Sequence, residues 1–180
     1  MLILVGASAS GKTEIAKRLI NTYGFKKFVT HTTRAPRVGE TNHIDYHFVS
    51  LEEFNTLETT DYFIETTHYN GYKYGTSYKE IGPKKVLIVD PNGANILVEK
   101  NPDDVIICLI QTPKEIRKER MLKRKDHIKD IEKRLENDDT LFSITQLHRV
   151  DYVIENDRVH LSTLTKEIYE YYNQNKGASY

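Results

Sequence analysis

Met1-Leu-Ile-Leu-Val-Gly-Ala-Ser-Ala-Ser-Gly-Lys-Thr13 opens the chain, and the organisation of the rest follows from these residues. Leu2 to Val5 form an unbroken apolar run, which is typical of a strand buried on both faces of a parallel sheet. The run leads into Gly6 to Thr13, which fits G-x-x-x-x-G-K-[ST] at every fixed position. Behind this loop, apolar side chains recur at helical spacing, at Ile15, Ala16, Leu19, Ile20 and Tyr23. The stretch therefore predicts a strand, a phosphate-binding loop and a helix in succession.

The loop predicts a site for a nucleoside triphosphate with Mg²⁺. A glycine-rich turn at the start of a helix presents backbone N–H groups and a partial positive charge to phosphate. Lys12 is placed to neutralise the β- and γ-phosphates, and the Thr13 hydroxyl to ligate Mg²⁺. The alternative, a glycine-serine turn that happens to precede a helix, does not explain the strand in front of it. The expected phosphate-binding residues are Gly6, Ala7, Ser8, Ala9, Ser10, Gly11, Lys12 and Thr13.

Length and charge limit the classes of protein that this chain can represent. Its 180 residues suit one domain with small insertions. The 26 basic residues equal the 26 acidic ones, so no overall field attracts nucleic acid or an anionic membrane. One cysteine, Cys108, cannot form an internal disulfide, and the first apolar run is too short for a signal peptide. We expect a cytoplasmic monomer or weak homodimer without nucleic-acid or membrane partners.

A basic loop follows the first helix, at residues 30–40. Arg34 and Arg37 flank Pro36 in a segment without apolar periodicity. Two guanidinium groups on a rigid loop match the geometry of one phosphate. The alternative is a solvated surface loop, and the nearby phosphate-binding loop favours the first interpretation.

His43 and His47 have the spacing of a zinc pair, but we reject a metal site. A zincin has a glutamate directly after the first histidine and a helix that carries both ligands. Here Ile44 follows His43, and the segment after it alternates like a strand.

The alternation of apolar runs and helical segments predicts a three-layer α/β fold with a parallel sheet. Ser50 to Glu53 is a capping box that begins a helix, whose inner face would carry Leu51, Phe54 and Leu57. Asn70-Gly71 is a type I′ hairpin signal between strands at 62–69 and 72–75. The other expected strands are 28–30, 84–90, 105–110 and 152–154, and the later expected helices are 113–121, 131–147 and 162–172.

The run Thr32-Thr-Arg-Ala-Pro-Arg-Val-Gly-Glu40, continued by Asp45-Tyr-His-Phe-Val49, resembles the signature of guanylate kinases. Those enzymes carry T-T-R-x-P-R-x-G-E and then D-Y-x-F-V, and Phe63-Ile-Glu65 and Gly71-Tyr-Lys-Tyr-Gly-Thr76 continue the resemblance. It implies a P-loop NTPase core at residues 1–32 and 82–180. It also implies an inserted β-rich GMP-binding domain at 33–81 and a basic helical lid at about 122–135. The implied activity is reversible phosphoryl transfer from ATP·Mg²⁺ to GMP or dGMP.

The same resemblance implies roles for single residues. Glu65 would accept hydrogen bonds from N1–H and the exocyclic amine of guanine, whereas adenine presents an unprotonated N1 on that edge. The further residues expected to bind GMP are Thr30, Arg34, Arg37, Glu40, Tyr46, Tyr74, Thr76 and Asp90. The residues expected to act on the transferring phosphoryl group are Lys12, Arg34, Arg120, Arg124 and Arg134. Asn156 is the expected adenine contact, although an Asx turn explains it without a ligand.

The chain departs from the family pattern at two places. Ile88 stands where guanylate kinases have the first acid of D-x-D. Asp90 keeps the second acid, either as a water-mediated Mg²⁺ ligand or acceptor contact or as the N-cap of a helix. Lys123 and Lys125 replace the glycines of the lid turn R-G-R-G, which predicts a shorter, stiffer or more helical lid.

These departures leave two alternatives beside a guanylate kinase. One is a related kinase of another nucleoside monophosphate or of a sugar phosphate, against which Glu65 and Thr76 argue. The other is a catalytically silent binding domain of the same family, against which the intact Gly11-Lys12-Thr13 argues. The basic segment that we interpret as a lid also has a plainer alternative, a solvated helix pair.

Overall fold

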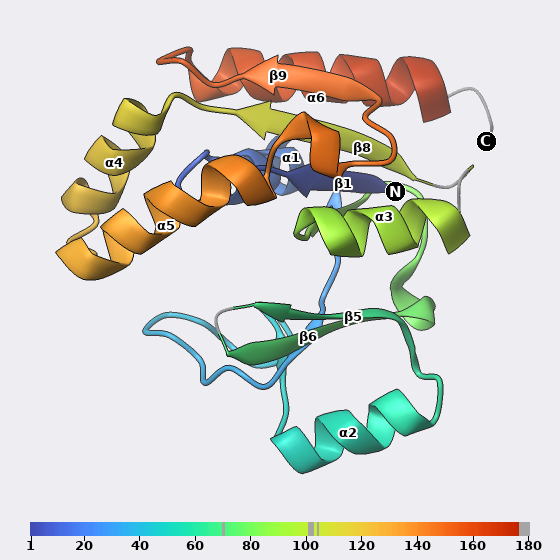
Figure 1. The fold of residues 1–180 in the computed structure, drawn as a ribbon. Helices are drawn as coiled ribbons and strands as arrows, with labels where there is room; N and C mark the ends of the chain where they lie inside the picture. The colour runs from blue at the N-terminus through green and yellow to red at the C-terminus, as the bar shows by residue number, and fades with distance from the viewer. Residues whose placement is uncertain (70, 101–102, 104, 177–180) are drawn as a thin grey trace.

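The computed structural model describes the chain except residues 70, 101, 102, 104 and 177–180 (Figure 1). A five-stranded sheet forms its centre, in the order β2-β7-β1-β8-β9, and all neighbouring strands are parallel. These strands are β1 (Leu2–Val5), β2 (Lys26–Lys27), β7 (Lys85–Ile88), β8 (Ile106–Gln111) and β9 (Tyr152–Glu155).

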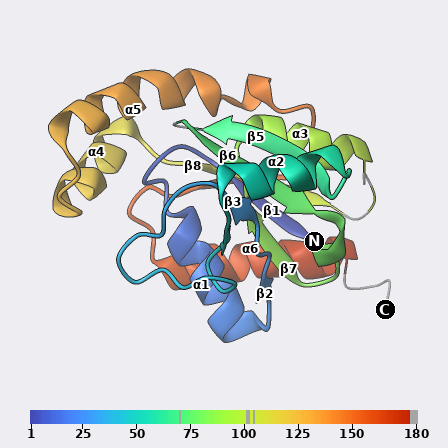
Figure 2. The ribbon, with the colours of Figure 1, turned by 90° about the horizontal axis from the view of Figure 1, so that it is seen from below.

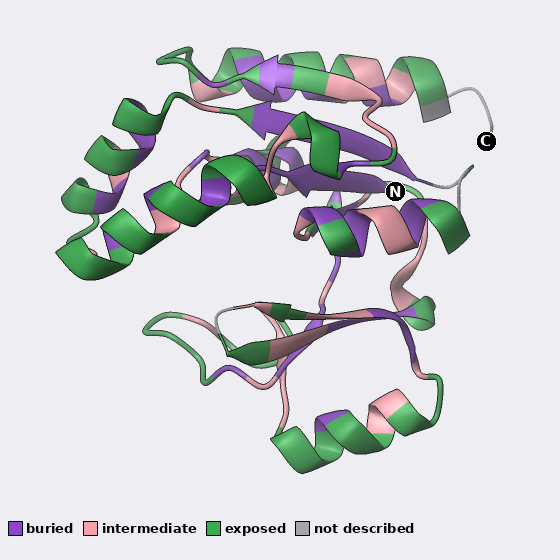
Figure 3. Cartoon of the chain, in the orientation of Figure 1, coloured by how far each residue is buried: buried purple, intermediate pink, exposed green. Residues whose placement is uncertain are grey.

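Helices cover both faces of this parallel sheet (Figure 1). Leu2 and Leu4 of β1 pack in one core cluster with side chains of α1 and α6, while Ile3 and Val5 pack in a second cluster with α3. All four residues of β1 are buried, as the purple strand in Figure 3 shows. The three-layer α/β fold is therefore confirmed. The helices are α1 (Lys12–Tyr23), α3 (Pro91–Lys100), α4 (Lys114–Lys123), α5 (Ile128–Leu141) and α6 (Leu161–Lys176).

A second, small sheet lies between β2 and β7 in the sequence, in the order β4-β3-β6-β5. Helix α2 (Leu51–Thr59) lies on its outer side, where Phe54 stacks on Phe63 with ring centroids 4.8 Å apart. The capping box of Ser50 and Glu53 is present. The strands and short 3₁₀ turns are β3 (His31–Thr32), β4 (His47–Phe48), β5 (Phe63–Tyr69), β6 (Tyr72–Ser77), η1 (Tyr78–Glu80) and η2 (Ile144–Gln146).

Several local expectations were wrong. The strand expected at 28–30 lies at Lys26–Lys27, because the last backbone contact with β7 is the Phe28 amide on Val86 O and the chain then crosses to the small sheet. Leu51 is 58% exposed, because the first residue of α2 lies off its buried side. The helix expected at 131–147 is α5, which begins earlier and ends at Leu141. Strand β7 ends at Ile88 rather than at 90, since α3 begins at Pro91.

The expected hairpin joins β5 and β6, which pair antiparallel up to Tyr69 and Tyr72. Asn70 itself lies outside the described residues. Gly71 has a φ of 82°, the left-handed backbone that a glycine at this turn supplies.

The lid expected at about 122–135 covers the end of α4, a turn at residues 124–127 and the first part of α5, and these two helices form a pair. In both views the pair lies at one edge of the molecule, at the carboxyl ends of the parallel strands (Figures 1 and 2). Lys125 has a φ of 62°, its amide bonds to Leu122 O at 2.9 Å, and the Asp126 amide bonds to Met121 O at 3.1 Å. These bonds end α4 with the pattern usually made by glycine. Lys123 is still helical, so only one of the two lysines takes the left-handed conformation.

Within the described part of the chain, no helix combines the length and the apolar character needed to cross a membrane.

Candidate active site

Both motif glycines of the phosphate-binding loop are required by close contacts. Gly6 has a φ of 156°, and a Cβ atom there would lie 2.5 Å from the carbonyl oxygen of Ile110 in β8. Gly11 has a φ of 101°, and its Cβ would clash with the amide nitrogen of Asn156. The loop is therefore wedged between the end of β8 and the segment that follows β9.

Lys12 is folded back onto the loop that carries it. Its ammonium group donates to the carbonyl oxygens of Gly6 and Ala7, the latter at 2.7 Å, and lies 3.3 Å from the Ser10 hydroxyl. Burial lowers the pKa of Lys12 to about 8. A lysine held in this way is close to any phosphate that enters the loop.

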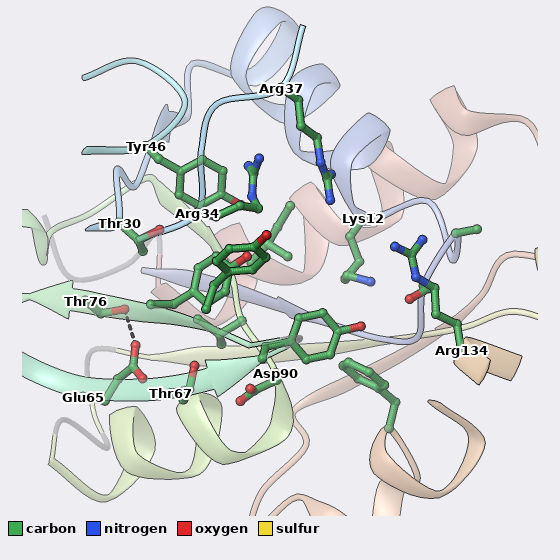
Figure 4. Close-up of a pocket in the computed structure, with 18 of the residues that line it drawn as sticks. Lys12, Thr30, Arg34, Arg37, Tyr46, Glu65, Thr67, Thr76, Asp90 and Arg134 are labelled. Carbon is green, nitrogen blue, oxygen red and sulfur yellow. Dashed lines mark hydrogen bonds between the residues drawn. The ribbon is translucent and has the colours of Figure 1, made fainter. Parts of the chain in front are cut away.

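A cavity of about 360 Å³ lies between the loop and the small sheet (Figure 4). The expected site residues that line it are Ser8, Ala9, Lys12, Thr30, Arg34, Arg37, Tyr46, Glu65, Tyr74, Thr76, Asp90, Arg124 and Arg134. The expected residues outside its lining are Gly6, Ala7, Ser10, Gly11, Thr13, Glu40, Arg120 and Asn156. Segments from both halves of the sequence thus meet at one place.

Glu65 provides a buried carboxylate at the end of the cavity within the small sheet. It is 5% exposed, and its Oε1 accepts a hydrogen bond from the Thr76 hydroxyl on the neighbouring strand (Figure 4). Its Oε2 has no hydrogen-bond partner among the described residues. Gly93 of α3 allows close approach, because a Cβ there would lie 3.2 Å from this oxygen. Burial raises the pKa of Glu65 to about 7.

Arg34 is buried and held rigidly. Its Nη2 donates to both carboxylate oxygens of Glu40, at 2.9 and 2.8 Å, and its Nη1 donates to Ala35 O at 2.7 Å. Its guanidinium carbon lies 5.4 Å from the centre of the Tyr46 ring. Arg37 is exposed and its side chain faces the cavity from the same loop (Figure 4). Glu40 therefore acts as the residue that orients Arg34.

Two of the three lid arginines reach the cavity, and Asp126 holds them together. Its carboxylate accepts from Arg124 Nε at 3.0 Å and from Arg134 Nη1 at 3.1 Å. The hydrogen bond from Arg124 lowers the pKa of Asp126. Arg124 from the turn and Arg134 from α5 therefore line the same cavity as Lys12.

Arg120 and Asn156 lie at the back of the phosphate-binding loop instead. Arg120 donates to Ala9 O and to Asn156 Oδ1, both at 3.2 Å. The amide nitrogen of Asn156 donates to Ser10 O at 2.7 Å, and the residue is 4% exposed. Both side chains shape the loop, and a contact of Asn156 with adenine stays a prediction.

Asp90 is the N-cap of α3, and its contact with Mg²⁺ or the acceptor stays a prediction. Its Oδ1 accepts from the Gly93 amide at 2.8 Å, as the N-cap of α3, and the residue also lines the cavity. Burial raises the pKa of Asp90. Ile88 lines the cavity at the position where the family pattern has an acid, and it is 37% exposed.

The described residues contain no group of three or more His, Cys, Asp or Glu side chains arranged to hold a metal ion. His43 and His47 lie with their Nδ1 atoms 2.8 Å apart, as two rings that share a hydrogen bond. Thr13 is exposed in the first turn of α1.

Five cavity residues were missed by the sequence analysis: Thr67, Tyr69, Tyr72, Val89 and Phe142. Two of them had a signal, since Thr67 and Tyr69 follow Glu65 at a spacing of two on β5 and such residues share a face. Phe142 comes directly after α5, where no periodic pattern marks it.

The cavity combines a phosphate-binding loop on a parallel sheet with a polar pocket on an inserted sheet, and arginines lie between them. This combination defines the class of P-loop nucleoside monophosphate kinases. The family model described as guanylate kinase matches residues 1–173, so the chain belongs to the guanylate kinase family.

Individual relatives agree with this assignment. The guanylate kinase of Campylobacter jejuni strain RM1221 is 34% identical over 169 residues, which cover 88% of this chain and 82% of that protein. The guanylate kinase of Schizosaccharomyces pombe is 36% identical over 120 residues, or 62% of this chain and 59% of that protein. The crystal structure of guanylate kinase from Anaplasma phagocytophilum matches with a TM-score of 0.74 at 27% identity, covering 94% of this chain and 82% of that one.

Proposed function

We propose that the protein is a guanylate kinase, which transfers the terminal phosphoryl group of ATP·Mg²⁺ reversibly to GMP or dGMP. The products are ADP and GDP or dGDP. The observation that carries this proposal is the buried carboxylate of Glu65, whose Oε2 is unpartnered among the described residues. The two oxygens of a carboxylate accept hydrogen bonds from adjacent donors on one edge of a base, and guanine presents two such donors.

Catalysis in this proposal consists of positioning and charge neutralisation. An oxygen of the acceptor phosphate attacks the γ-phosphorus, the bond to the bridging oxygen breaks, and ADP leaves with that oxygen. Arg34 and Arg37 hold the acceptor phosphate with the hydroxyls of Tyr46 and Tyr74. Lys12, Arg124 and Arg134 stabilise the charge on the transferring group. Thr30 and Thr76 assist Glu65 at the base.

Mg²⁺ fits this site as an ion that arrives with the phosphates. It keeps several waters and needs few protein ligands, so a single hydroxyl from the chain suffices. Thr13 would supply that hydroxyl, and its exposure leaves room for a hydrated ion. Asp90 would contact the ion only through water. When bound, Mg²⁺ neutralises charge on the phosphates.

Two segments would move as units around a core of residues 1–32 and 82–180. They are the GMP-binding insertion, residues 33–81, and the lid at about 122–135. The helical ends and the short turn of the lid support a rigid movement rather than a loop that reorders.

A coupled assay of ADP release tests the function, with ATP·Mg²⁺ and a panel of GMP, dGMP, AMP, CMP, UMP and ribose phosphates. Turnover confined to GMP and dGMP is the expected result. Turnover with another acceptor would show that this compound, rather than GMP, is the substrate. ATP binding without turnover on any acceptor would identify a silent binding domain.

A further inference from the structure

Helix α5 places a buried acid against the phosphate-binding loop. Asp138 is 2% exposed, and its Oδ2 accepts a hydrogen bond from the backbone amide of Ser8 at 2.6 Å. A buried carboxylate is unfavourable unless charged or polar partners compensate it. The loop amide supplies one such partner.

The position of this carboxylate resembles that of an anion bound by the loop. Backbone amides of a glycine-rich loop at a helix N-terminus are the groups that bind phosphate. Here one of them is used by Asp138, and the charge of Asp138 acts on the nearby Lys12 ammonium group. That ammonium group is itself turned onto the carbonyl oxygens of Gly6 and Ala7. The Asp138 carboxylate, the Ser8 amide and the Lys12 ammonium group therefore all have partners within the protein itself.

Contacts between the lid helices hold Asp138 in place. The next residue, Asp139, pairs with Lys114 at 3.0 Å and with the buried Arg117, both on α4. On the same helix end, the Phe142 ring lies 5.6 Å from Lys12 Nζ. Asp138 thus stands on a braced helix that crosses the end of the parallel sheet (Figures 1 and 2).

We propose that Asp138 is a further residue of the phosphoryl-donor site, which holds the Ser8 amide in place of a phosphate oxygen and weakens binding of the donor's phosphate chain. ATP then has to displace this carboxylate or bind beside its negative charge. The same repulsion favours release of the product ADP. The identity of the donor rests on the proposed function, whereas the competition with phosphate rests on the loop alone.

The test compares Asp138→Asn with Glu136→Gln. Asparagine at 138 keeps the size and one acceptor oxygen for the Ser8 amide but removes the charge. The Glu136→Gln variant loses the same charge from an exposed position of the same helix. Calorimetric titration of the full chain with tripolyphosphate, without Mg²⁺, measures the loop by itself. We expect binding about tenfold tighter in Asp138→Asn, and a change of less than about twofold in Glu136→Gln.

Two further readouts separate this role from a structural one. Adenosine, which lacks phosphates, should bind Asp138→Asn and the unmodified protein equally. In steady-state assays the KM for ATP should fall in Asp138→Asn while the KM for GMP does not change. If Asp138→Asn does not fold, Asp138→Ser carries the same expectation with a shorter neutral acceptor.

Tripolyphosphate that binds Asp138→Asn no more tightly than Glu136→Gln would overturn the proposal. So would weaker binding, because Asp138 would then support the loop rather than compete with phosphate. Because this titration uses no acceptor nucleotide, its result remains a valid test of Asp138 even if the acceptor panel excludes GMP as the substrate.

Discussion

At the scale of single residues, Glu65 links burial to substrate choice. Its carboxyl group has a pKa of about 7 because it is buried, so the ligand-free protein is partly protonated there near neutral pH. The two donors of guanine need the ionised form. GMP affinity should therefore rise between about pH 6 and about pH 8, as the carboxyl group loses its proton.

Calorimetry with GMP across this range checks the prediction, with Glu65→Gln as the comparison. The variant should bind GMP with no rise over this pH range, and its kcat/KM for GMP should be lower by on the order of a hundredfold. An equal rise in both proteins would assign the titration to another group. The stability effect has the opposite sign: protonated Glu65 favours folding fully below about pH 4.5, and this is lost as the pH rises through about 7.

Lys12 gives a second prediction at this scale. Lys12→Ala should lower turnover by on the order of a hundredfold or more, because no other side chain replaces the cation inside the loop. Lys17→Ala is the matched control, since Lys17 lies on the same helix and pairs with Glu14 at the surface, outside the cavity. Its activity should be unchanged in the ADP-release assay. Near-normal turnover in Lys12→Ala would contradict the mechanism.

The residues found from the sequence are those whose neighbours along the chain identify them. Lys12, Arg34 and Glu65 stand in motifs of fixed spacing, and all three line the cavity. Asp138 was missed because its contact is with the Ser8 amide, 130 residues away in the sequence. Asp126 was missed although Arg124 and Arg134 are near it in the sequence, because no motif marks an acid that joins them. The spacing of Ile131, Leu135 and Asp138 along α5 places Asp138 on the buried face of the helix, a signal that the sequence analysis did not use.

At the scale of elements, the lid turn makes a testable contrast between two lysines. Lys125 has a left-handed backbone, which is unfavourable for any residue with a Cβ atom, whereas Lys123 is helical. Lys125→Gly should raise the free energy of unfolding by up to about 1 kcal/mol. Lys123→Gly should lower it by about 1 kcal/mol, since glycine is a poor helix former. Urea unfolding of both variants measures the difference, and equal losses would refute the contrast.

Elements were predictable where local chemistry controls their ends. The strand, loop and helix at the N-terminus and the capping box of α2 are coded by adjacent residues, and both are observed. The strand expected at 28–30 was misplaced because pairing with β7, more than fifty residues away, selects Lys26 and Lys27. Which of the two lid lysines would be left-handed also depends on where α4 ends.

At the scale of the whole molecule, ligand binding should stabilise the fold selectively. A ligand at about a hundred times its Kd adds about 2.7 kcal/mol to the free energy of unfolding. For a chain of this size that corresponds to a rise in Tm of roughly 5–10 °C. GMP should produce this rise in a thermal melt, and AMP at the same concentration should not. Equal shifts with both nucleotides would mean that Glu65 does not select the base.

The central position of β1 has a consequence for synthesis on the ribosome. This strand leaves the exit tunnel well before its partners on either side, β7 and β8, because they lie much later in the sequence. The small sheet lies between them in translation order and pairs mostly within itself. The insertion can therefore fold during synthesis while β1 is still unpaired. The parallel sheet around β1 assembles only after residue 111, the end of β8, has emerged from the ribosome.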